Sequence, residues 1–311
     1  MASSFMYAVA ILLAVITFSN FPVIKWYKLR SIPEADPWAF LAKFFYLAKP
    51  KRHILEAAHK KVSLTFPGSA YKLQSLDGEI LVLPPKYFDE LRRLENTNLS
   101  ASQQQEQLLM TAYTKASVSN TLIHHLKRNI GIRYGEFVPD LFKEAEYILG
   151  IDLPATDDWT SIPFLEKTTH ILAGVTGLVT YGAELNRNEE WIKANLLYVE
   201  SVLKGAWKIR IIPSFLRPVA KYLMSEFQHI TKATETVYRL GEPVIRARAE
   251  AMASLDFERP DDLMQWLLDA NPPKNKDDIR EQLKCQLMTS LASIHASSMA
   301  LTQVIYGRSA L

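Results

Sequence analysis

The chain has 311 residues, of which 48% are hydrophobic, so it is not a disordered protein and can bury a core in one large domain or two smaller ones. Its formal net charge is +3 and its basic residues are scattered, so no nucleic-acid partner is expected. One cysteine, Cys285, excludes an internal disulfide and every motif of paired cysteines. A reducing compartment fits this composition.

Residues 1–24 carry no charge, and their centre, "FMYAVAILLAVITF", is apolar enough to enter a bilayer. This stretch predicts a transmembrane anchor. Lys25, Lys28 and Arg30 follow the apolar run, whereas the charges of a cleaved signal peptide precede it, so the anchor should be retained with the rest of the chain facing the cytoplasm. A buried core helix is the alternative, because the run is short.

Residues 25–37, which end in "SIPEADP", predict a basic and proline-rich hinge before a domain at 38–311. "SAYKLQSLDGEILVLPP" alternates around Asp77-Gly78 and predicts a β-hairpin whose second strand ends at Pro84-Pro85. The pattern is helical from Lys86 onward. The fold class is therefore mainly α with a small N-terminal β-hairpin. The predicted helices lie within 86–94, 137–149, 164–182, 188–207, 224–253 and 261–270.

The sequence has no glycine-rich phosphate loop, His-Glu-x-x-His, Gly-x-Ser-x-Gly or glycine-rich dinucleotide turn. Common nucleotide, zinc-hydrolase and serine-hydrolase activities therefore lack their key residues. In "HHLKRNIG", His124, His125, Lys127 and Arg128 together could face a bound anion. An amphipathic helix with a solvated polar face gives the same pattern.

A long last helix is predicted to begin near Asp277 and Asp278, whose charges suit the positive end of a helix dipole. Small side chains then dominate "TSLASIHASSMALTQ", so something wide and flat could approach the backbone of this part of the helix closely. Close packing of another helix would need the same small residues. One apolar stripe should pack into the core, consisting of Ile279, Leu283, Leu287, Leu291, Ile294, Leu301 and Ile305.

Several stretches, in this order, resemble fungal membrane-bound cytochrome P-450 enzymes, the haem-thiolate monooxygenases. They are the anchor and hinge, "DGEILVLPPKYFDELRRL", "LNRNEEWIKAN", "RPDDLMQWLLDA" and "SIHASSMALTQVIY". The set is most similar to the ent-kaurene oxidase-like and mycotoxin-pathway branch. The resemblance covers nearly the whole chain and implies a haem cofactor, a reductase partner and a hydrophobic terpenoid or polyketide-derived substrate.

By this resemblance the long helix lies over the distal face of the haem, and Ala292 to Ser297 form the oxygen-binding stretch. His295 then stands at the usual acidic position and Ala296 at the usual threonine, so Ser297 or Ser293 with water would have to deliver protons. Ala292 and Ser293 would contact the cofactor. His125 or Arg128 would lie near a haem propionate, whose charge a cation offsets.

The segment "WKIRIIPSFLRPVAKYL" alternates apolar and basic residues between two prolines, so it could rest in a lipid interface. The resemblance assigns substrate access to this region and the endoplasmic reticulum membrane to the protein. An internal helix junction is the alternative interpretation.

Full-length members of the resembled family continue past this helix to a Glu-x-x-Arg helix and a cysteine loop that supplies the iron ligand. Neither follows Tyr306, so we expect a truncated chain that lacks the haem thiolate and is inactive alone. Cys285 lies upstream of the oxygen-binding stretch and is expected to be a structural thiol. The second hypothesis is a membrane-anchored helical protein that binds an apolar ligand or partner without catalysis.

Overall fold

The computed structural model describes residue 32 and residues 68–75, 78–94 and 99–309. The expected anchor at 1–24 lies outside these residues, as does the expected hinge apart from Ile32. None of the helices in the described part is long and apolar enough to span a bilayer. The chain divides into two compact units, the first made of Met1–Ala101 with Arg210–Arg217 and the second of Ser102–Ile209 with Pro218–Leu311.

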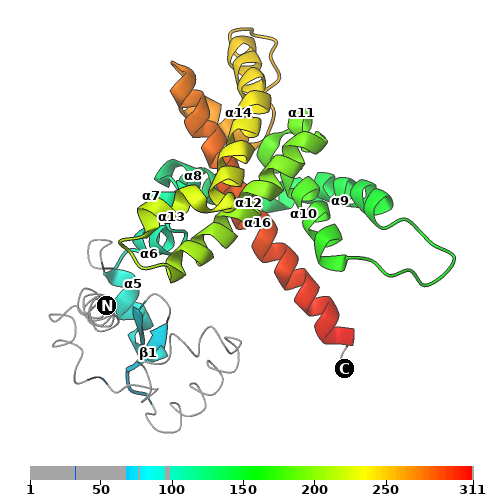
Figure 1. Ribbon diagram of the computed structural model, residues 1–311. Coiled ribbons are helices and arrows are strands. Elements are labelled where there is room, and N and C mark those ends of the chain that lie inside the picture. Colours follow the sequence, from blue (N-terminus) through cyan, green and yellow to red (C-terminus); the bar gives the residue numbers. More distant parts are fainter. Residues whose placement is uncertain (1–31, 33–67, 76–77, 95–98, 310–311) are drawn as a thin grey trace, which may run out of the picture. The chain divides into compact units, whose positions relative to one another are not determined.

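The first unit contains the predicted hairpin, drawn in pale blue in Figure 1. Strand β1 (Tyr71–Ser75) pairs antiparallel with β2 (Gly78–Val82), and Ser75 lies opposite Gly78. The hairpin is thus confirmed, but Gly78 belongs to the strand, which corrects the turn position expected from Asp77-Gly78. The prolines end β2 as predicted: a 3₁₀ turn, η1 (Pro85–Tyr87), follows and leads into α5 (Phe88–Arg93).

The second unit is helical. Its elements in chain order are α6 (Ala101–Leu108), α7 (Thr111–Thr114), α8 (Asn120–His125), the π-helical turn η2 (Leu126–Gly131), α9 (Ile132–Asp152), α10 (Phe164–Tyr181), α11 (Ala183–Asn186), α12 (Glu189–Ile211), α13 (Arg217–Leu223), α14 (Ser225–Ala251), α15 (Leu263–Ala270) and α16 (Lys276–Ser309). Each helix that the periodicity predicted is present. The short helices α6, α7, α11 and α13 were not predicted.

Side-chain caps explain where several of these helices begin. The Ser119 hydroxyl accepts the Leu122 N–H at 3.1 Å and starts α8, and the Asp262 carboxylate accepts the Gln265 N–H at 2.8 Å and starts α15. At the start of α16, the side-chain oxygen of Asn275 accepts the amides of both Asp277 and Asp278. These polar residues fix the helix starts because they satisfy amides that have no partner within the helix.

Helix α16 runs through the centre of the second unit (Figure 1) and has 34 residues, which corresponds to about 50 Å at ~1.5 Å per residue. It packs against α10, α14 and α15. The predicted stripe is buried at Ile279, Leu283, Leu287, Leu291 and Ile294. The stripe was wrong at its far end: Leu301 and Ile305 are exposed, whereas Thr302 between them is buried and the Tyr306 ring lies 6.1 Å from the ring of Phe164 at the start of α10.

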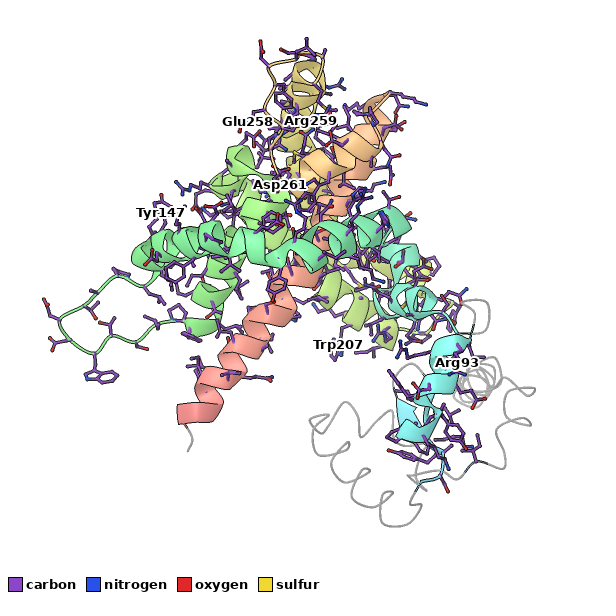
Figure 2. All side chains as sticks on the ribbon, turned by 180° about the vertical axis from the view of Figure 1, so that it is seen from behind. Arg93, Tyr147, Trp207, Glu258, Arg259 and Asp261 are labelled. Carbon is purple, nitrogen blue, oxygen red and sulfur yellow. The ribbon has the colours of Figure 1, made fainter. Side chains whose placement is uncertain are left out.

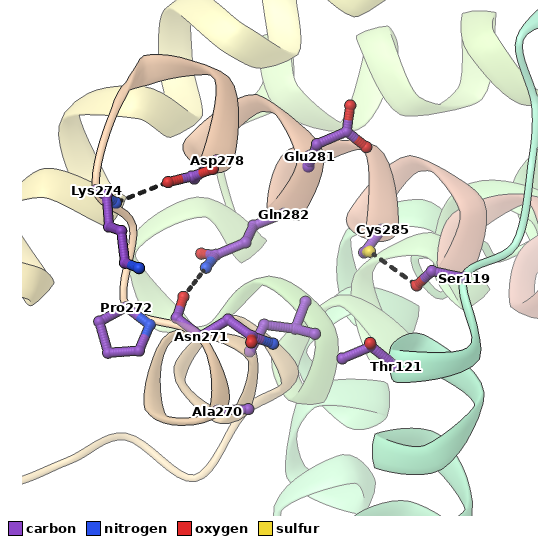
Figure 3. Close-up of a pocket in the computed structure, with 11 residues that line it drawn as sticks. Ser119, Thr121, Ala270, Asn271, Pro272, Lys274, Asp278, Glu281, Gln282 and Cys285 are labelled. Atoms are coloured by element: carbon purple, nitrogen blue, oxygen red, sulfur yellow. Dashed lines mark hydrogen bonds between the residues drawn. The ribbon is translucent and has the colours of Figure 1, made fainter.

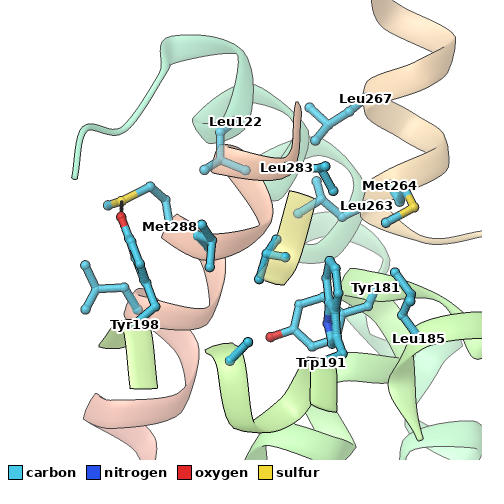
Figure 4. Packing of buried hydrophobic residues seen from close by; sticks show 14 of the residues in the cluster. Leu122, Tyr181, Leu185, Trp191, Tyr198, Leu263, Met264, Leu267, Leu283 and Met288 are labelled. Carbon is cyan, nitrogen blue, oxygen red and sulfur yellow. Dashed lines mark hydrogen bonds between the residues drawn. The ribbon is translucent and has the colours of Figure 1, made fainter. Parts of the chain in front are cut away.

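The core around α16 is rich in large side chains (Figure 4). The rings of Tyr181 and Trp191 meet edge to face with their centroids 5.4 Å apart, and Trp191 is fully buried. Gly241 lets α14 approach this cluster, because a Cβ at that position would lie 2.4 Å from Leu283 and 3.1 Å from Trp191. Aromatic packing and close helix contact therefore hold the first half of α16 in place.

Candidate functional site

The second half of α16 exposes the small residues that the sequence singled out. Ala292, Ala296 and Ala300 are spaced by four positions, so they share one face, and all three are exposed. His295 and Ser297 flank this face and are exposed as well. No other helix packs over these alanines in the described part of the chain, so the small side chains leave an open, flat strip of helix surface.

A buried polar chain runs beneath this strip and joins three helices. The Tyr181 hydroxyl on α10 hydrogen-bonds the Ser290 hydroxyl on α16, which lies 2.8 Å from the side-chain oxygen of Asn195 on α12. The Asn195 amide in turn donates to the Trp191 carbonyl at 2.9 Å. One turn further along α16, the Ser293 hydroxyl is buried with no hydrogen-bond partner in the described structure. Burial raises the pKa of Tyr181 to about 12, so its phenol stays protonated and can donate.

The histidine pair predicted as an anion site lies at the end of α8, and Arg128 follows in the π-helical turn η2. His125 is half-buried and its Nδ1 lies 3.4 Å from the Asn129 amide, while His124 and Arg128 are exposed. Burial lowers the pKa of His125, and the neighbouring His124 and Arg128 lower it further, so this imidazole is neutral near pH 7.

The predicted site residues thus occupy two places in the second unit. Ala292, Ser293, His295 and Ser297 stand together on α16, and His125 and Arg128 stand together on α8 and η2. Among the described residues, no hydrogen bond or ion pair joins the two groups.

Two hollows lie beside the first half of α16, and no sequence motif indicates either of them. The first, about 640 Å³, lies between the start of α8, the end of α15 and α16 (Figure 3), and we call it the thiol hollow because Cys285 lines it. The Cys285 sulfur lies 3.7 Å from the Ser119 hydroxyl, and burial raises the pKa of the thiol. The Gln282 amide donates to the Asn271 carbonyl at 2.7 Å, whereas its own oxygen has no partner in the described structure.

The second hollow is larger, about 1080 Å³, and lies between α7, α12, α13, α14 and α16. We call it the tyrosine hollow, after Tyr113, Tyr198, Tyr222 and Tyr238 in its wall. Tyr198 is almost fully buried, and its hydroxyl makes only a long contact, 3.8 Å, with the Met288 sulfur (Figure 4). Burial raises the pKa of Tyr198, and the neighbouring Tyr238 raises it further.

Strained backbone borders the tyrosine hollow. Helix α7 stands between Met110 at φ 50° and Lys115 at φ 62°, both left-handed conformations that a side chain with a Cβ rarely adopts. Each costs on the order of 1–2 kcal/mol relative to ordinary backbone. The surrounding bonds maintain this turn: the Thr114 hydroxyl donates to the Leu109 carbonyl at 2.8 Å and the Thr111 hydroxyl to the Ala116 carbonyl at 2.6 Å.

The segment predicted to rest in a lipid interface exposes much of its apolar surface. Trp207 (Figure 2), Ile211, Phe215 and Leu216 are exposed to between 43% and 56%, so they are available to a bilayer or another partner. The turn within the segment is well defined, because Arg217 donates to the carbonyls of Ile212 at 2.8 Å and Arg210 at 3.0 Å.

Comparisons with known proteins identify relatives for most of this chain. It is 29% identical over 248 residues to the cytochrome P450 monooxygenase AN1598 of Emericella nidulans. This match covers 78% of the chain and 46% of that protein. Its relatives are fungal cytochrome P450 monooxygenases. The chain is 25% identical over 288 residues to the monooxygenase paxP of Penicillium paxilli, covering 90% of the chain and 55% of that protein. It is 26% identical over 258 residues to the cytochrome P450 monooxygenase prx8 of Penicillium rubens, and this match covers 81% of the chain and 47% of that protein.

No protein-family model matches the chain. The chain spans about half the length of the curated relatives it matches. These relatives agree with the mainly helical architecture and with haem as the cofactor expected for such proteins.

Proposed function

We propose that this chain is part of a haem-dependent cytochrome P450 monooxygenase that oxidises a hydrophobic secondary metabolite, terpenoid or polyketide-derived, with dioxygen. The observation that carries the proposal is the open strip of alanines on α16, together with the similarity to cytochrome P450 monooxygenases over most of the chain. A haem is flat and largely apolar, so it suits a helix face without bulky side chains. The same similarity to enzymes disfavours the alternative of a non-catalytic binding protein.

The residues present fit this cofactor at the strip. Ala292 and Ala296 are exposed and small enough for a porphyrin or its bound oxygen to approach the helix backbone. The buried Ser293 hydroxyl, which has no partner among the described residues, offers a hydrogen bond beside them. Haem would supply the iron that binds and reduces dioxygen, and His125 and Arg128 are the candidates for contact with its propionates.

Proton delivery is the role proposed for the polar residues of the strip. Ala296 carries no hydroxyl, so the exposed Ser297 hydroxyl would have to pass protons from solvent at one edge of the strip, while the exposed His295 lies at the other edge. Ser293 would hold a water molecule on the buried side. The requirement for electrons implies a reductase partner, as expected from the relatives.

We further propose that residues 1–24 anchor the protein in the endoplasmic reticulum membrane with the rest of the chain facing the cytoplasm. The exposed apolar residues at 207–216 support a second lipid contact, through which apolar substrates would enter. Carbonate extraction of microsomes tests the anchor: the full chain should stay in the membrane pellet, and a variant lacking residues 1–24 should be released. Equal release of both would contradict the anchor.

Haem binding by the chain tests the cofactor site directly. Titration of the full chain with hemin, followed by the Soret band, should show saturable binding that Ala296→Trp weakens by about tenfold or more, because the indole would occupy the strip. Ala247→Trp is the matched control, since Ala247 is an exposed alanine on α14 away from the strip. Equal hemin affinity of the two variants would contradict the proposed cofactor site.

A further inference from the structure

The tyrosine hollow is large enough for a small molecule of several fused rings. Pockets that hold such ligands have volumes of roughly 300–1,000 Å³, and this hollow, at about 1080 Å³, lies just above that range. Four tyrosines and Phe227 supply flat apolar surfaces in its wall. A ligand with aromatic or fused rings would stack against them.

The polar groups of the hollow favour a ligand that accepts hydrogen bonds. The hydroxyls of Thr111, Thr114 and Thr234 are committed as donors to backbone carbonyls. The Tyr198 hydroxyl is available as a donor, because its long contact with sulfur is weak. Ammonium groups at Lys115, Lys221 and Lys284 add further donors around the hollow. The wall therefore offers mainly N–H and O–H groups to an occupant.

The balance of charge around the hollow favours an anion. Three lysines and two glutamates line the hollow, and Lys284 pairs with Glu281, so Lys115 and Lys221 outnumber the one remaining carboxylate, Glu235. Lys115 and Lys221 form no ion pair with any residue in the described part of the chain. Lys221 instead lies with its ammonium group 4.8 Å from the ring centroid of Tyr222. The lining therefore has one more ammonium group than carboxylate, and this excess of positive charge favours an anionic ligand.

The strained position of Lys115 adds an independent argument. A left-handed residue with a full side chain is unfavourable for folding, and glycine would fill the same position without strain. Strain of this kind is concentrated at ligand-binding sites. Lys115 belongs to the wall of the hollow, so its ammonium group is held there at the expense of backbone stability.

We infer that the tyrosine hollow is a binding site for an aromatic or fused-ring carboxylate, separate from the alanine strip of α16. The rings would stack on the tyrosines, and the carboxylate would bind Lys115 and Lys221. Because the site contains no part of the strip, ligand binding here does not require haem, and it can be tested whether or not the proposed function is correct.

Two probes of the same shape separate charge from apolar contact. Anthracene-2-carboxylate and the uncharged anthracene-2-carboxamide are titrated into the full chain by fluorescence anisotropy. The carboxylate should bind about tenfold more tightly than the amide, and added salt should reduce this difference because the ammonium groups are partly exposed. Equal affinity for the two probes, or binding of neither, would overturn the inference.

Lys115→Gly is the decisive variant, because it removes the ammonium group and relieves backbone strain at once. The variant should melt at the same temperature as the unaltered chain or higher, yet lose about tenfold in affinity for the carboxylate and nothing for the amide. Met110→Gly is its control, since it relieves the same kind of strain outside the wall of the hollow and should leave both affinities unchanged.

A second pair of variants tests the position of the probe. Thr234→Trp fills the hollow from α14 and should abolish binding of both probes, whereas Thr236→Trp, two positions along and outside the wall, should not. Retention of binding in Thr234→Trp, or unchanged carboxylate affinity in Lys115→Gly, would show that the probes bind elsewhere.

Discussion

Arg248 on α14 is the most deeply buried cation in the described part of the chain, with a side chain only 3% exposed. It donates two hydrogen bonds of 2.8 Å to the buried Asp262 carboxylate and further bonds to Glu184. Burial disfavours the charge of Arg248, but these hydrogen bonds outweigh it and raise its pKa. The backbone of Gly182 passes beside them, where a Cβ would lie 2.3 Å from the guanidinium.

Removal of this guanidinium should be strongly destabilising. Arg248→Ala leaves the Asp262 charge buried and unpaired, so the free energy of unfolding should fall by about 3–5 kcal/mol. Arg239→Ala is the control: Arg239 also pairs with a carboxylate, Glu190, but both side chains are more than half exposed, and its loss should cost less than about 1 kcal/mol. Urea denaturation measures both values, and similar losses in the two variants would contradict the argument.

Asp152 at the end of α9 predicts a dependence of stability on pH. Burial raises its pKa, but hydrogen bonds from His170 at 2.5 Å and Lys167 at 3.0 Å outweigh this effect, and the net pKa is lowered. A carboxylate with a lowered pKa stabilises the folded state fully above its unfolded pKa, which is about 3.9, and the contribution is lost as pH falls through the lower folded value.

Acid unfolding with and without this carboxylate measures its contribution. Between pH 6 and about pH 3 the unaltered chain should lose more stability than Asp152→Asn, because only the former takes up a proton at this position on unfolding. Asp140→Asn is a suitable control, since Asp140 pairs with Lys143 on the exposed face of α9. Parallel loss of stability in all three proteins would contradict the assignment.

At the scale of the helices, the contact of α10 with its neighbours depends on glycine. A Cβ at Gly177 would lie 2.1 Å from the Asn186 side-chain oxygen and 3.0 Å from the Tyr181 ring, so the helix can approach α11 only without a side chain at this position. A Cβ added at Gly135, on α9, would instead lie in open space, with no atom within 4 Å.

The same substitution should therefore have opposite effects at the two glycines. Gly177→Ala should destabilise the protein by about 1–3 kcal/mol because the added carbon overpacks a buried contact. Gly135→Ala should stabilise it by up to ~1 kcal/mol, the gain expected for alanine in a helix interior. Thermal melting of the two variants checks the signs, and a neutral Gly177→Ala would show that α10 and α11 can separate at little cost.

The elements that could be predicted from sequence are those with a strong local signal. The hairpin and the long helices follow from periodicity, and Asp277-Asp278 marks the start of α16. Helix α7 is too short for a periodic pattern. The residues at its two ends, Met110 and Lys115, have left-handed backbone, which a sequence normally indicates by glycine. Exposure of Leu301 and Ile305 depends on which face of the last turns of α16 the neighbouring elements cover, and the periodicity of α16 does not contain this information.

The candidate site was predictable in part for the same reason. The small residues of α16 could be recognised in the sequence, because a run of small side chains stands where a long central helix would be expected to carry large ones. The tyrosine hollow was not, because its lining comes from α7, α12, α13, α14 and α16, and each contributes residues that are ordinary in their own segment. Only the packing of these helices brings Tyr198, Tyr238 and Lys115 to one cavity.

At the scale of the whole molecule, exposed apolar residues occur along α9 and the end of α16. Ile132, Tyr134, Val138 and Phe142 on α9 are each more than half exposed, and Tyr147 on the same helix (Figure 2) is exposed with the Arg187 guanidinium 4.1 Å from its ring centroid. Val304 and Tyr306 on α16 are likewise more than half exposed. Surfaces of this kind are characteristic of contact sites rather than of fully solvated helices.

The position of Cys285 allows a prediction about iron ligation by this chain. Its sulfur faces Ser119 in the thiol hollow (Figure 3), on the same helix as the alanine strip but before the strip begins. Burial raises the pKa of the thiol, so it is protonated at neutral pH, whereas the thiolate is the form that binds iron. Cys285 should therefore not act as the axial ligand of a haem bound at the strip.

Spectroscopy of the haem-loaded chain tests this prediction. After reduction and addition of carbon monoxide, the 311-residue chain should show no thiolate-type Soret band, and Cys285→Ser should have the same spectrum and the same hemin affinity. A thiolate-type band that disappears in Cys285→Ser would place the haem at the thiol hollow and contradict the proposed cofactor site. Loss of hemin binding in Ala296→Trp alone would instead place the cofactor at the strip, with the iron ligand supplied by a residue other than Cys285.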